Sequence, residues 1–356
     1  MRAPWLSPDV SYRILLVVLF GVALALPSAW LAATSIAGWR AGDGAVLHIV
    51  DLGDAERRFE AAFPFRKPYW RVHNRIRHAL FGAYPASVVS GQNGWWFYRS
   101  EAAEDGPGLN DRAGRAVPSA AEVERWRAVL ERRRAWLAGL NVIYVPVIAP
   151  NKHTIYPDQL PAGLLREQGE TRLDRFMRAV GPWPSGLLDL RPPLLAARRR
   201  GEVYLLTDTH WNDEGAYVAY AAIVAAVRTA LPSTPFFEQT CFAAVREAFR
   251  GDIVTMASLA VEEAVVRLRP DPMRCVEERA VAQLGGPAIL LFGDSYAARL
   301  SPFLQQSARR FAAAERLFGQ ADVLAFRPDV VVHEIAERHL DAMFDEAPPD
   351  RLRVSR

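Results

Sequence analysis

The sequence of 356 residues has almost no lysine and little net charge. Lys67 and Lys152 are its two lysines, arginine supplies the rest of the 43 basic residues, and 40 acidic residues leave a net charge of +3. So small an excess argues against nucleic acid as a partner, since nucleic-acid-binding proteins concentrate positive charge on one face. Tandem repeats and low-complexity tracts are also lacking, which excludes solenoid and fibrous proteins.

Long apolar runs are lacking too, except for one near the N-terminus. Residues 14–39 carry no charged side chain, and about 20 apolar residues cross a bilayer as a helix. We therefore expect a cytoplasmic segment over residues 1–13 and a signal anchor over 14–36, with a cleaved signal peptide as the alternative. Either interpretation places residues 40–356 in the periplasm, held at the inner membrane if the anchor is retained.

Cysteine is equally scarce, and its two copies lie in one stretch of the chain. Cys241 and Cys275 are close enough in sequence to close a loop with a disulfide. Two buried free thiols that never meet are the alternative. We expect the disulfide, because export supplies an oxidising compartment.

Hydrophobic residues make up 51% of the chain, and beyond residue 140 they form short runs that alternate with helical segments. This alternation predicts an α/β domain with a largely parallel sheet covered on both faces. Residues 232–286 interrupt the alternation and predict a strand-rich insertion. Asn93-Gly94, between apolar runs, predicts a β-hairpin over 87–98. We expect helices at 120–140, 172–180 and 214–231, and strands at 142–148, 186–190, 203–206, 288–292 and 329–335.

The first chemical motif, Gly293-Asp294-Ser295-Tyr296, directly follows the apolar run 288–292. Sites in open α/β sheets form outside the carboxyl ends of the strands. A serine on the turn from strand to helix exposes its hydroxyl, and the N–H groups of the helix N-terminus can hold a developing oxyanion. The alternative is that Asp294 and Ser295 only cap the helix.

The second motif is Asp208-Thr209-His210-Trp211. Residues two apart in an extended segment point to the same side, so the Asp208 carboxylate can orient the His210 ring and leave its other nitrogen free as a base. A structural Asp–His pair is the alternative, and a metal site lacks further ligands at a recognisable spacing. Because a serine needs a base and the base needs an orienting group, the two motifs together predict a triad of Ser295, His210 and Asp208, with no metal and no cofactor.

With these motifs, the chain resembles the exported acetyltransferases of the alginate O-acetylation machinery, most closely the membrane-anchored members without a carbohydrate-binding domain. Asp-Thr-His-Trp preceding Gly-Asp-Ser is typical of that group, whereas ordinary SGNH hydrolases place the serine first. The matching stretches are Ser90–Tyr98, Ala149–Tyr156, Thr207–Asn212, Phe292–Tyr296 and Pro328–Val332 with Glu337-Arg338.

The resemblance implies an SGNH-hydrolase-like three-layer α/β/α sandwich with a rearranged strand order. It also implies transfer of acetyl groups to a secreted polysaccharide through an acetylated serine, with Asp208, His210 and Ser295 as the catalytic residues. The implied partners are a membrane-bound O-acyltransferase that supplies acetyl, the exopolysaccharide acceptor and other polysaccharide secretion proteins.

Further residues are candidates for substrate binding by position. Asn151 and Lys152 follow the strand 142–148, on the same rim as the triad, and Tyr296 adjoins Ser295. Two other functions compete with acetyl transfer. An acetylesterase would use the same triad with water as the acceptor, and a scaffold would bind polysaccharide without catalysis.

Overall fold

A computed structural model describes residues 17–18, 20–22, 25, 66–99, 108–116, 118–165, 169–314 and 317–345. The chain divides into two compact units, Met1–Ala83 and Tyr84–Arg356. The first contains α3 (Arg66–Phe81). The expected anchor over 14–36 lies outside the described residues, apart from 17–18, 20–22 and 25, and no described helix is long and apolar enough to cross a membrane.

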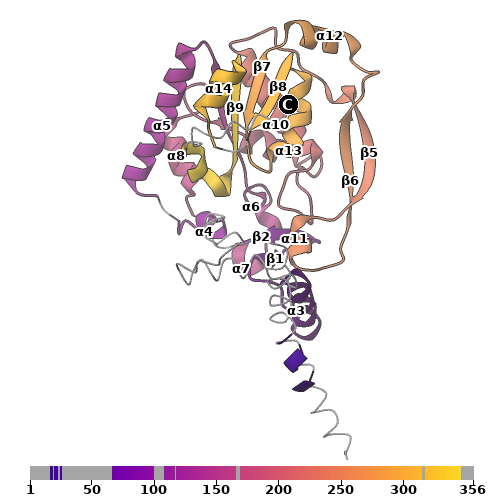
Figure 1. Ribbon diagram of the computed structural model, residues 1–356. Helices are drawn as coiled ribbons and strands as arrows, with labels where there is room; N and C mark the ends of the chain where they lie inside the picture. The colour runs from indigo at the N-terminus through magenta and orange to yellow at the C-terminus, as the bar shows by residue number, and fades with distance from the viewer. Residues whose placement is uncertain are drawn as a thin grey trace, which may run out of the picture. The chain divides into compact units, whose positions relative to one another are not determined.

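Five parallel strands form the central sheet of the second unit (Figure 1). The three central strands are almost entirely buried, which is why they read in the sequence as unbroken apolar runs. The parallel sheet expected from the alternating pattern is therefore confirmed. In spatial order the strands are β4 (Leu188–Asp189), β3 (Ile143–Ala149), β9 (Val330–Ala336), β7 (Ala288–Phe292) and β8 (Arg310–Ala314).

Two separate apolar clusters lie on the two faces of this sheet. Alternate residues of β3 divide between them, Val145 and Val147 on one face and Tyr144 and Ile148 on the other. One face packs against α9 (Arg191–Ala197), α10 (Asp213–Arg228) and α13 (Ala297–Gln306). The other packs against α5 (Ala120–Gly139), α8 (Arg172–Val180), α14 (Gln320–Phe326) and the 3-10 helix η3 (Glu337–Phe344).

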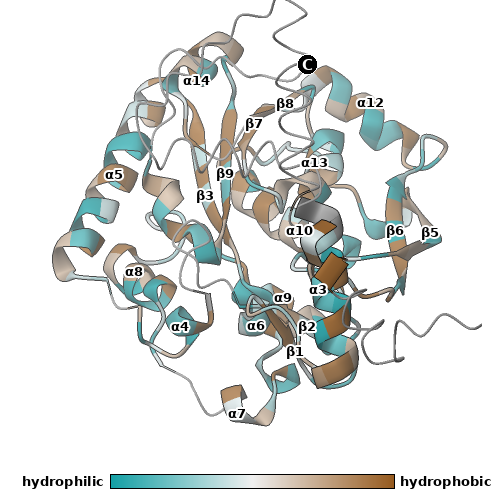
Figure 2. Ribbon diagram, turned by 60° about the horizontal axis from the view of Figure 1, so that its bottom comes forward, coloured by the Kyte–Doolittle hydropathy of each residue, from teal (hydrophilic) through white to brown (hydrophobic). Residues whose placement is uncertain are grey.

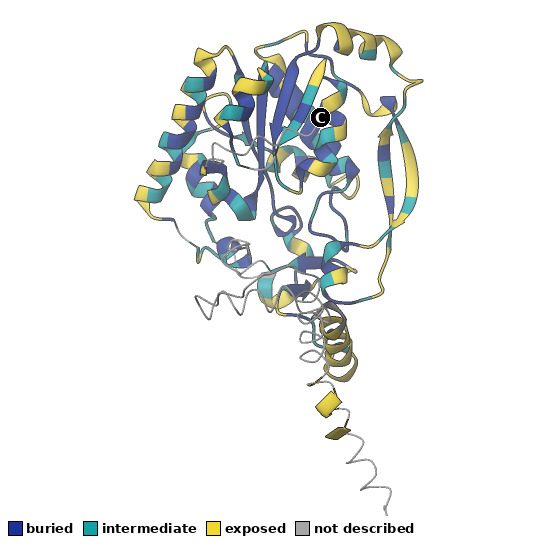
Figure 3. Ribbon diagram, viewed as in Figure 1, coloured by how far each residue is buried: buried dark blue, intermediate teal, exposed yellow. Residues whose placement is uncertain are grey.

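The result is the expected three-layer α/β/α arrangement. The apolar strands lie between helices that are polar on their outer sides (Figure 2). Burial follows the same division: the central strands are buried (dark blue) and the outer faces of the helices are exposed (yellow) (Figure 3). The smaller elements are α4 (Gly108–Arg112), α6 (Lys152–Ile155), η1 (Pro157–Gln159), α7 (Ala162–Leu165) and η2 (Gln239–Cys241).

The predicted hairpin is confirmed. β1 (Val88–Ser90) pairs antiparallel with β2 (Trp96–Tyr98). Asn93 and Gly94 both have positive φ, 52° and 81°, as the turn requires.

Two expectations about the sheet are corrected. Residues 203–206 do not form one of its strands, and Tyr204 makes only an isolated antiparallel bridge with Trp211. The reason is local. The Val203 carbonyl accepts the Asn212 N–H, and the Leu205 N–H donates to the His210 carbonyl, so the segment folds back on itself. The sheet instead gains β8, a mixed segment that the apolar pattern does not reveal.

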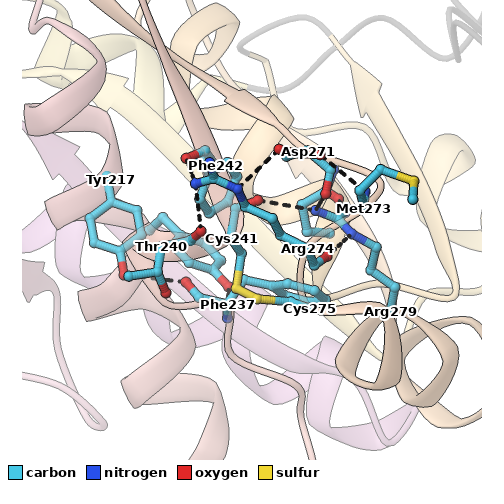
Figure 4. The surroundings of a disulfide bond; sticks show 12 residues. Tyr217, Phe237, Thr240, Cys241, Phe242, Asp271, Met273, Arg274, Cys275 and Arg279 are labelled. Carbon is cyan, nitrogen blue, oxygen red and sulfur yellow. Dashed lines mark hydrogen bonds and ion pairs between the residues drawn. A yellow bond between two sulfur atoms is a disulfide. The ribbon is translucent and has the colours of Figure 1, made fainter.

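The insertion over 232–286 contains helices as well as the expected strands. Its strands β5 (Phe242–Phe249) and β6 (Glu263–Pro270) pair antiparallel, and between and after them lie α11 (Asp252–Met256) and α12 (Val276–Gly285). Cys241 and Cys275, with Cα atoms 5.5 Å apart, form a disulfide that closes the segment carrying both strands and α11 (Figure 4). Beside it Arg274 and Arg279 donate hydrogen bonds to the backbone carbonyls of Phe242 and Asp271 in the same segment.

Candidate active site

Polar side chains collect where three neighbouring strands end. β9 lies between β3 and β7, and Ala149 at the end of β3 is level with Ala336 at the end of β9. Lys152 follows β3, Ser295 follows β7, and η3 begins directly after β9. The parallel sheet therefore brings these residues to one edge, the place where α/β proteins bind ligands.

The structure brings Asp208, His210 and Ser295 together in one line of hydrogen bonds. Ser295 Oγ lies 2.8 Å from His210 Nε2, and His210 Nδ1 lies 2.6 Å from Asp208 Oδ1. Asp208 is buried, His210 is partly buried and Ser295 is exposed. The line thus runs from the protein interior to a hydroxyl that solvent and ligands can reach.

This geometry fixes how the ring of His210 is used. The ionised carboxylate can only accept, so Nδ1 carries the hydrogen and Nε2 offers its lone pair to the hydroxyl of Ser295. Burial opposes the charge of Asp208, but the hydrogen bonds that its carboxylate accepts from the ring and backbone of His210 and from the backbone of Asp252 outweigh it and hold the pKa of Asp208 below its usual value. The ring is therefore oriented as a base for Ser295.

The turn that carries Ser295 is held by Asp294. Its Oδ1 accepts the Tyr296 N–H, and its Oδ2 accepts the Ala336 N–H at the end of β9. Burial opposes ionisation, but His339 and these two N–H groups together lower the pKa of Asp294. Asp294 therefore fixes the turn before α13 (Ala297–Gln306) without capping that helix, whose N-cap position is Tyr296, while Ser295 is left to face His210.

Lys152 is buried rather than presented to a ligand. Its Nζ donates to three backbone carbonyls, those of Trp96 at 2.6 Å, Leu206 at 2.8 Å and Asp208 at 3.0 Å. Three acceptors use all three hydrogens of an ammonium group. Burial nevertheless lowers the pKa of Lys152 to about 7, against the pull of nearby carboxylates. The expectation of a substrate-binding lysine is corrected: Lys152 holds the backbone that carries Asp208.

Tyr296 and Asn151 are also placed beneath the site rather than on it. Tyr296 is fully buried, its hydroxyl donates to the Thr209 carbonyl, and its ring lies 4.8 Å from that of His210. Asn151 is 3% exposed, and its backbone N–H donates to Glu337. The sequence predicted that both residues contact substrate. Because both are buried, they instead support the neighbouring loops.

Two residues of the insertion also hold the loop 206–210, and sequence reasoning missed both. Glu263 of β6 accepts the backbone N–H groups of Leu206 and Thr207, and the Thr207 hydroxyl. Asp252 of α11 accepts the backbone N–H and the hydroxyl of Thr209. Neither lies in a motif, and each is more than forty residues from its partner, so no local signal could have found them.

A metal ion does not fit this cluster well. Asp208, His210 and Asp252 are the only described group of at least three potential ligand residues in reach of one ion, their ligand atoms lying within 4.8 Å of one another. A metal would need a bare lone pair on the ring nitrogen, whereas the nitrogen nearest both carboxylates donates its hydrogen to Asp208 at 2.6 Å. The arrangement is that of a hydrogen-bonded Asp–His pair, with a proton between the ring nitrogen and the carboxylate, rather than that of a metal site.

Several known proteins are similar to this chain in sequence or in fold. A probable alginate O-acetylase AlgJ of Pseudomonas syringae pv. tomato is 26% identical over 362 positions, covering 94% of this chain and 90% of the relative. The solved structure of Bacillus cereus PatB1 with a sulfonyl adduct has the same fold, with 13% identity, a TM-score of 0.52, and coverage of 73% of this chain and 100% of that one.

Pseudomonas aeruginosa AlgX is also similar in fold, with 17% identity, a TM-score of 0.50, and coverage of 72% of this chain and 65% of that one. Residues 88–337 match the family described as SGNH hydrolase-like domain, acetyltransferase AlgX. This match spans the hairpin, the whole sheet, the insertion and all three residues of the hydrogen-bonded line. The chain therefore belongs to the SGNH hydrolase-like acetyltransferase family of AlgX.

Proposed function

We propose that this protein transfers acetyl groups to hydroxyls of a secreted, alginate-like polysaccharide through an acetylated Ser295. The observation that carries the proposal is the line of hydrogen bonds from buried Asp208 through His210 to exposed Ser295. A free serine hydroxyl is a weak nucleophile, and an oriented base is what it needs. The acceptor is proposed from the name of the relative, a probable alginate O-acetylase.

In the first half-reaction, Ser295 Oγ attacks the carbonyl carbon of an acetyl donor as His210 Nε2 takes its proton. Asp208 stabilises the resulting imidazolium. Within the described part of the chain nothing accepts the backbone N–H of Ser295, which leaves this donor for the oxyanion. The intermediate collapses to acetyl-Ser295, and His210 returns the proton to the leaving group.

In the second half-reaction, a sugar hydroxyl takes the place of the leaving group. His210 accepts its proton, the sugar oxygen attacks the acetyl carbon, and Ser295 leaves with the proton that His210 returns. The products are the O-acetylated sugar and free enzyme. Water in place of the sugar would give acetate, so exclusion of water decides between transfer and hydrolysis.

The test uses the purified full-length chain with an activated acetyl ester as donor and oligouronates as acceptors. We expect acetylated oligosaccharide, and after rapid quenching one acetyl group on the peptide that contains Ser295. Ser295→Ala should lower transfer on the order of 10⁴–10⁶-fold. Ser301→Ala, in the same turn-and-helix region, is the control, since its hydroxyl bonds only the Ala297 carbonyl. Acetate without acetylated sugar would identify an esterase instead.

We further propose a periplasm-facing location with the anchor over residues 14–36, and a membrane-bound O-acyltransferase as the supplier of acetyl. A chain with an uncharged run of this length ahead of its enzyme domain suits such an arrangement. A reporter that is active only outside the cytoplasm, fused after Arg356, should be active in cells. Loss of reporter activity in the fusion would contradict this location.

A further inference from the structure

We propose that Asp252 is a second carboxylate for His210: it positions the loop 208–210 and shares the positive charge that the ring acquires during the reaction. The charge-sharing part rests on the proposed role of His210 as the base. Asp252 lies 44 residues from Asp208 in the sequence, at the first position of α11 within the insertion. Nothing in the AlgX-type motifs of this chain points to it.

The first argument is a reciprocal clamp between Asp252 and the loop. The Asp252 backbone N–H donates to Asp208 Oδ2 at 2.9 Å. In return, Asp252 Oδ1 accepts the Thr209 N–H at 2.8 Å. Each aspartate thus holds the backbone of the other's segment, and Asp208 cannot rotate away from His210 without breaking this pair.

The second argument is that the Thr209 hydroxyl connects Asp252 to the His210 ring through hydrogen bonds. Its hydroxyl donates to Asp252 Oδ2 at 2.6 Å, so its oxygen lone pairs face His210 Nδ1, 3.1 Å away. The Nδ1–H is therefore shared between Asp208 Oδ1 and the Thr209 hydroxyl. Through that hydroxyl the ring is connected to a second carboxylate, whose Oδ2 is itself only 3.7 Å from Nδ1.

The third argument is how firmly α11 is seated. Ile253 and Val254 are fully buried and pack with Trp96 of the β1–β2 hairpin. Gly251 lies so close to the loop that a Cβ would come within 2.1 Å of the Thr207 carbonyl oxygen. Packing therefore fixes α11 in place, and with it the position from which Asp252 reaches the loop.

The charges around His210 allow a second carboxylate to act. Burial and the negative charge of Asp208 raise the pKa of Asp252, while hydrogen bonds from Thr209 and the charge of His210 oppose them. Lys152 and Glu263 also act on this cluster, as does Arg338, whose guanidinium lies over the ring of Tyr296. Arg338, and Lys152 below about pH 7, offset part of the negative charge of Asp208, Asp252 and Glu263, so that two carboxylates can face one imidazolium.

The experiment measures the titration of the His210 ring by NMR in the full-length Ser295→Ala protein, so that the readout does not depend on acetyl transfer. Asp252→Asn removes the charge and keeps one acceptor, and we expect the midpoint of the His210 titration to fall by roughly 0.5–1 pH unit. Asp271→Asn is the control, since Asp271 is a partly buried aspartate of the same insertion whose carboxylate bonds only Arg274 and the Met273 N–H. An unchanged midpoint in Asp252→Asn would overturn the inference.

Kinetics with Ser295 intact supply a second readout. For Asp252→Asn we expect kcat to fall by up to about tenfold, the equivalent of a shift of one pKa unit. KM should change little, and the acid limb of the pH profile should move to lower pH. Thr209→Val should behave like Asp252→Asn, whereas Thr209→Ser should retain activity because it keeps the hydroxyl. If Asp252→Asn does not fold, the two Thr209 variants provide the test. Equal activity of Thr209→Val and Thr209→Ser would then refute the proposal. Full activity of Ser295→Ala would instead refute the proposed function and leave the NMR result standing.

Discussion

Asp208 uses its two carboxylate oxygens for different tasks. Oδ1 receives both the ring and the backbone N–H of His210, at 2.6 and 2.9 Å, and Oδ2 receives the N–H of Asp252. A residue that only capped the following helix would need neither ring contact nor burial. That helix is in fact capped by Asn212, whose side chain accepts the Gly215 N–H. Asp208 is therefore free of the capping role that competed with catalysis.

The first prediction concerns Asp208→Asn. The amide can donate to Nδ1 and so favour the ring tautomer with its hydrogen on Nε2, which removes the base facing Ser295. In the serine-protease case such a swap costs about 10⁴ in kcat, and we expect a smaller but still large loss here because Asp252 remains near the ring. Steady-state kinetics together with an unchanged melting temperature would check this. Activity within a few-fold of the wild type would leave Asp208 without a catalytic role.

Lys152→Met provides the second prediction. Methionine has a similar length but no donor, so three buried carbonyls around the site would lose their partner. We expect a loss of stability on the order of 2–4 kcal/mol, and a fall in kcat because the backbone of Asp208 is released. Urea unfolding and kinetics measure the two effects, with exposed Arg199→Met as the control. A substrate-binding lysine would instead raise KM and leave stability unchanged.

At the scale of elements, the insertion completes the site. β6 supplies Glu263 and α11 supplies Asp252, and the Cys241–Cys275 disulfide closes the segment that contains both. The loop 206–210 belongs to no strand of the sheet, so its shape depends on these contacts and on Lys152. An element that interrupts the α/β alternation is thus part of the candidate active site.

Gly251→Ala tests that dependence as the third prediction. The new Cβ would meet the Thr207 carbonyl at 2.1 Å, and because the obstacle is backbone, α11 must move away from the loop. We expect a loss of about 1–3 kcal/mol in the free energy of unfolding and a marked fall in kcat. Gly285→Ala in α12 is the matched control, since its Cβ would meet nothing within 4 Å. If both alanine variants are equally stable and active, α11 does not need this close approach.

At the scale of the whole molecule, buried carboxyls make stability depend on pH in opposing directions. Asp208 and Asp294 have lowered pKa values, so the stability they contribute is present above their unfolded pKa and lost as pH falls. Glu337 behaves in the opposite way. Its burial raises its pKa to about 7, although the Asn151 N–H and the Thr154 hydroxyl favour the charged form.

The fourth prediction follows from Glu337. Between its usual pKa of 4.5 and about 7, the unfolded chain has lost this proton while the folded chain keeps it, so rising pH favours unfolding. Glu337→Gln cannot titrate, so from pH 4.5 to pH 8 its stability should gain roughly 3 kcal/mol relative to the wild type. Urea unfolding of both proteins at the two pH values gives this difference. A constant difference between the proteins would show that folding does not raise the pKa of Glu337.

Local patterns in the sequence determined much of the fold. The strand 288–292 and the helix 172–180 coincide with β7 and α8, and Asn93-Gly94 forms the predicted turn. Burial on both faces requires an unbroken apolar strand, and positive φ requires particular residues, so both leave a signal within a few residues. The two motifs also pointed to Asp208, His210 and Ser295. Ser295 follows a sheet strand, as the apolar run before it indicated, and Asp208 and His210 are two residues apart, so the carboxylate reaches the ring locally. The anchor over 14–36 stays a prediction.

Only the tertiary structure decided what surrounds those three residues. It turned 203–206 back on itself, added β8 to the sheet, and buried Lys152 and Tyr296 beneath the loop instead of presenting them to substrate. It also brought Asp252 and Glu263 to the loop from an insertion without any recognisable motif. These contacts join residues more than forty positions apart. Their energy depends on burial and on which donors remain unpaired, and both exist only after the chain has packed.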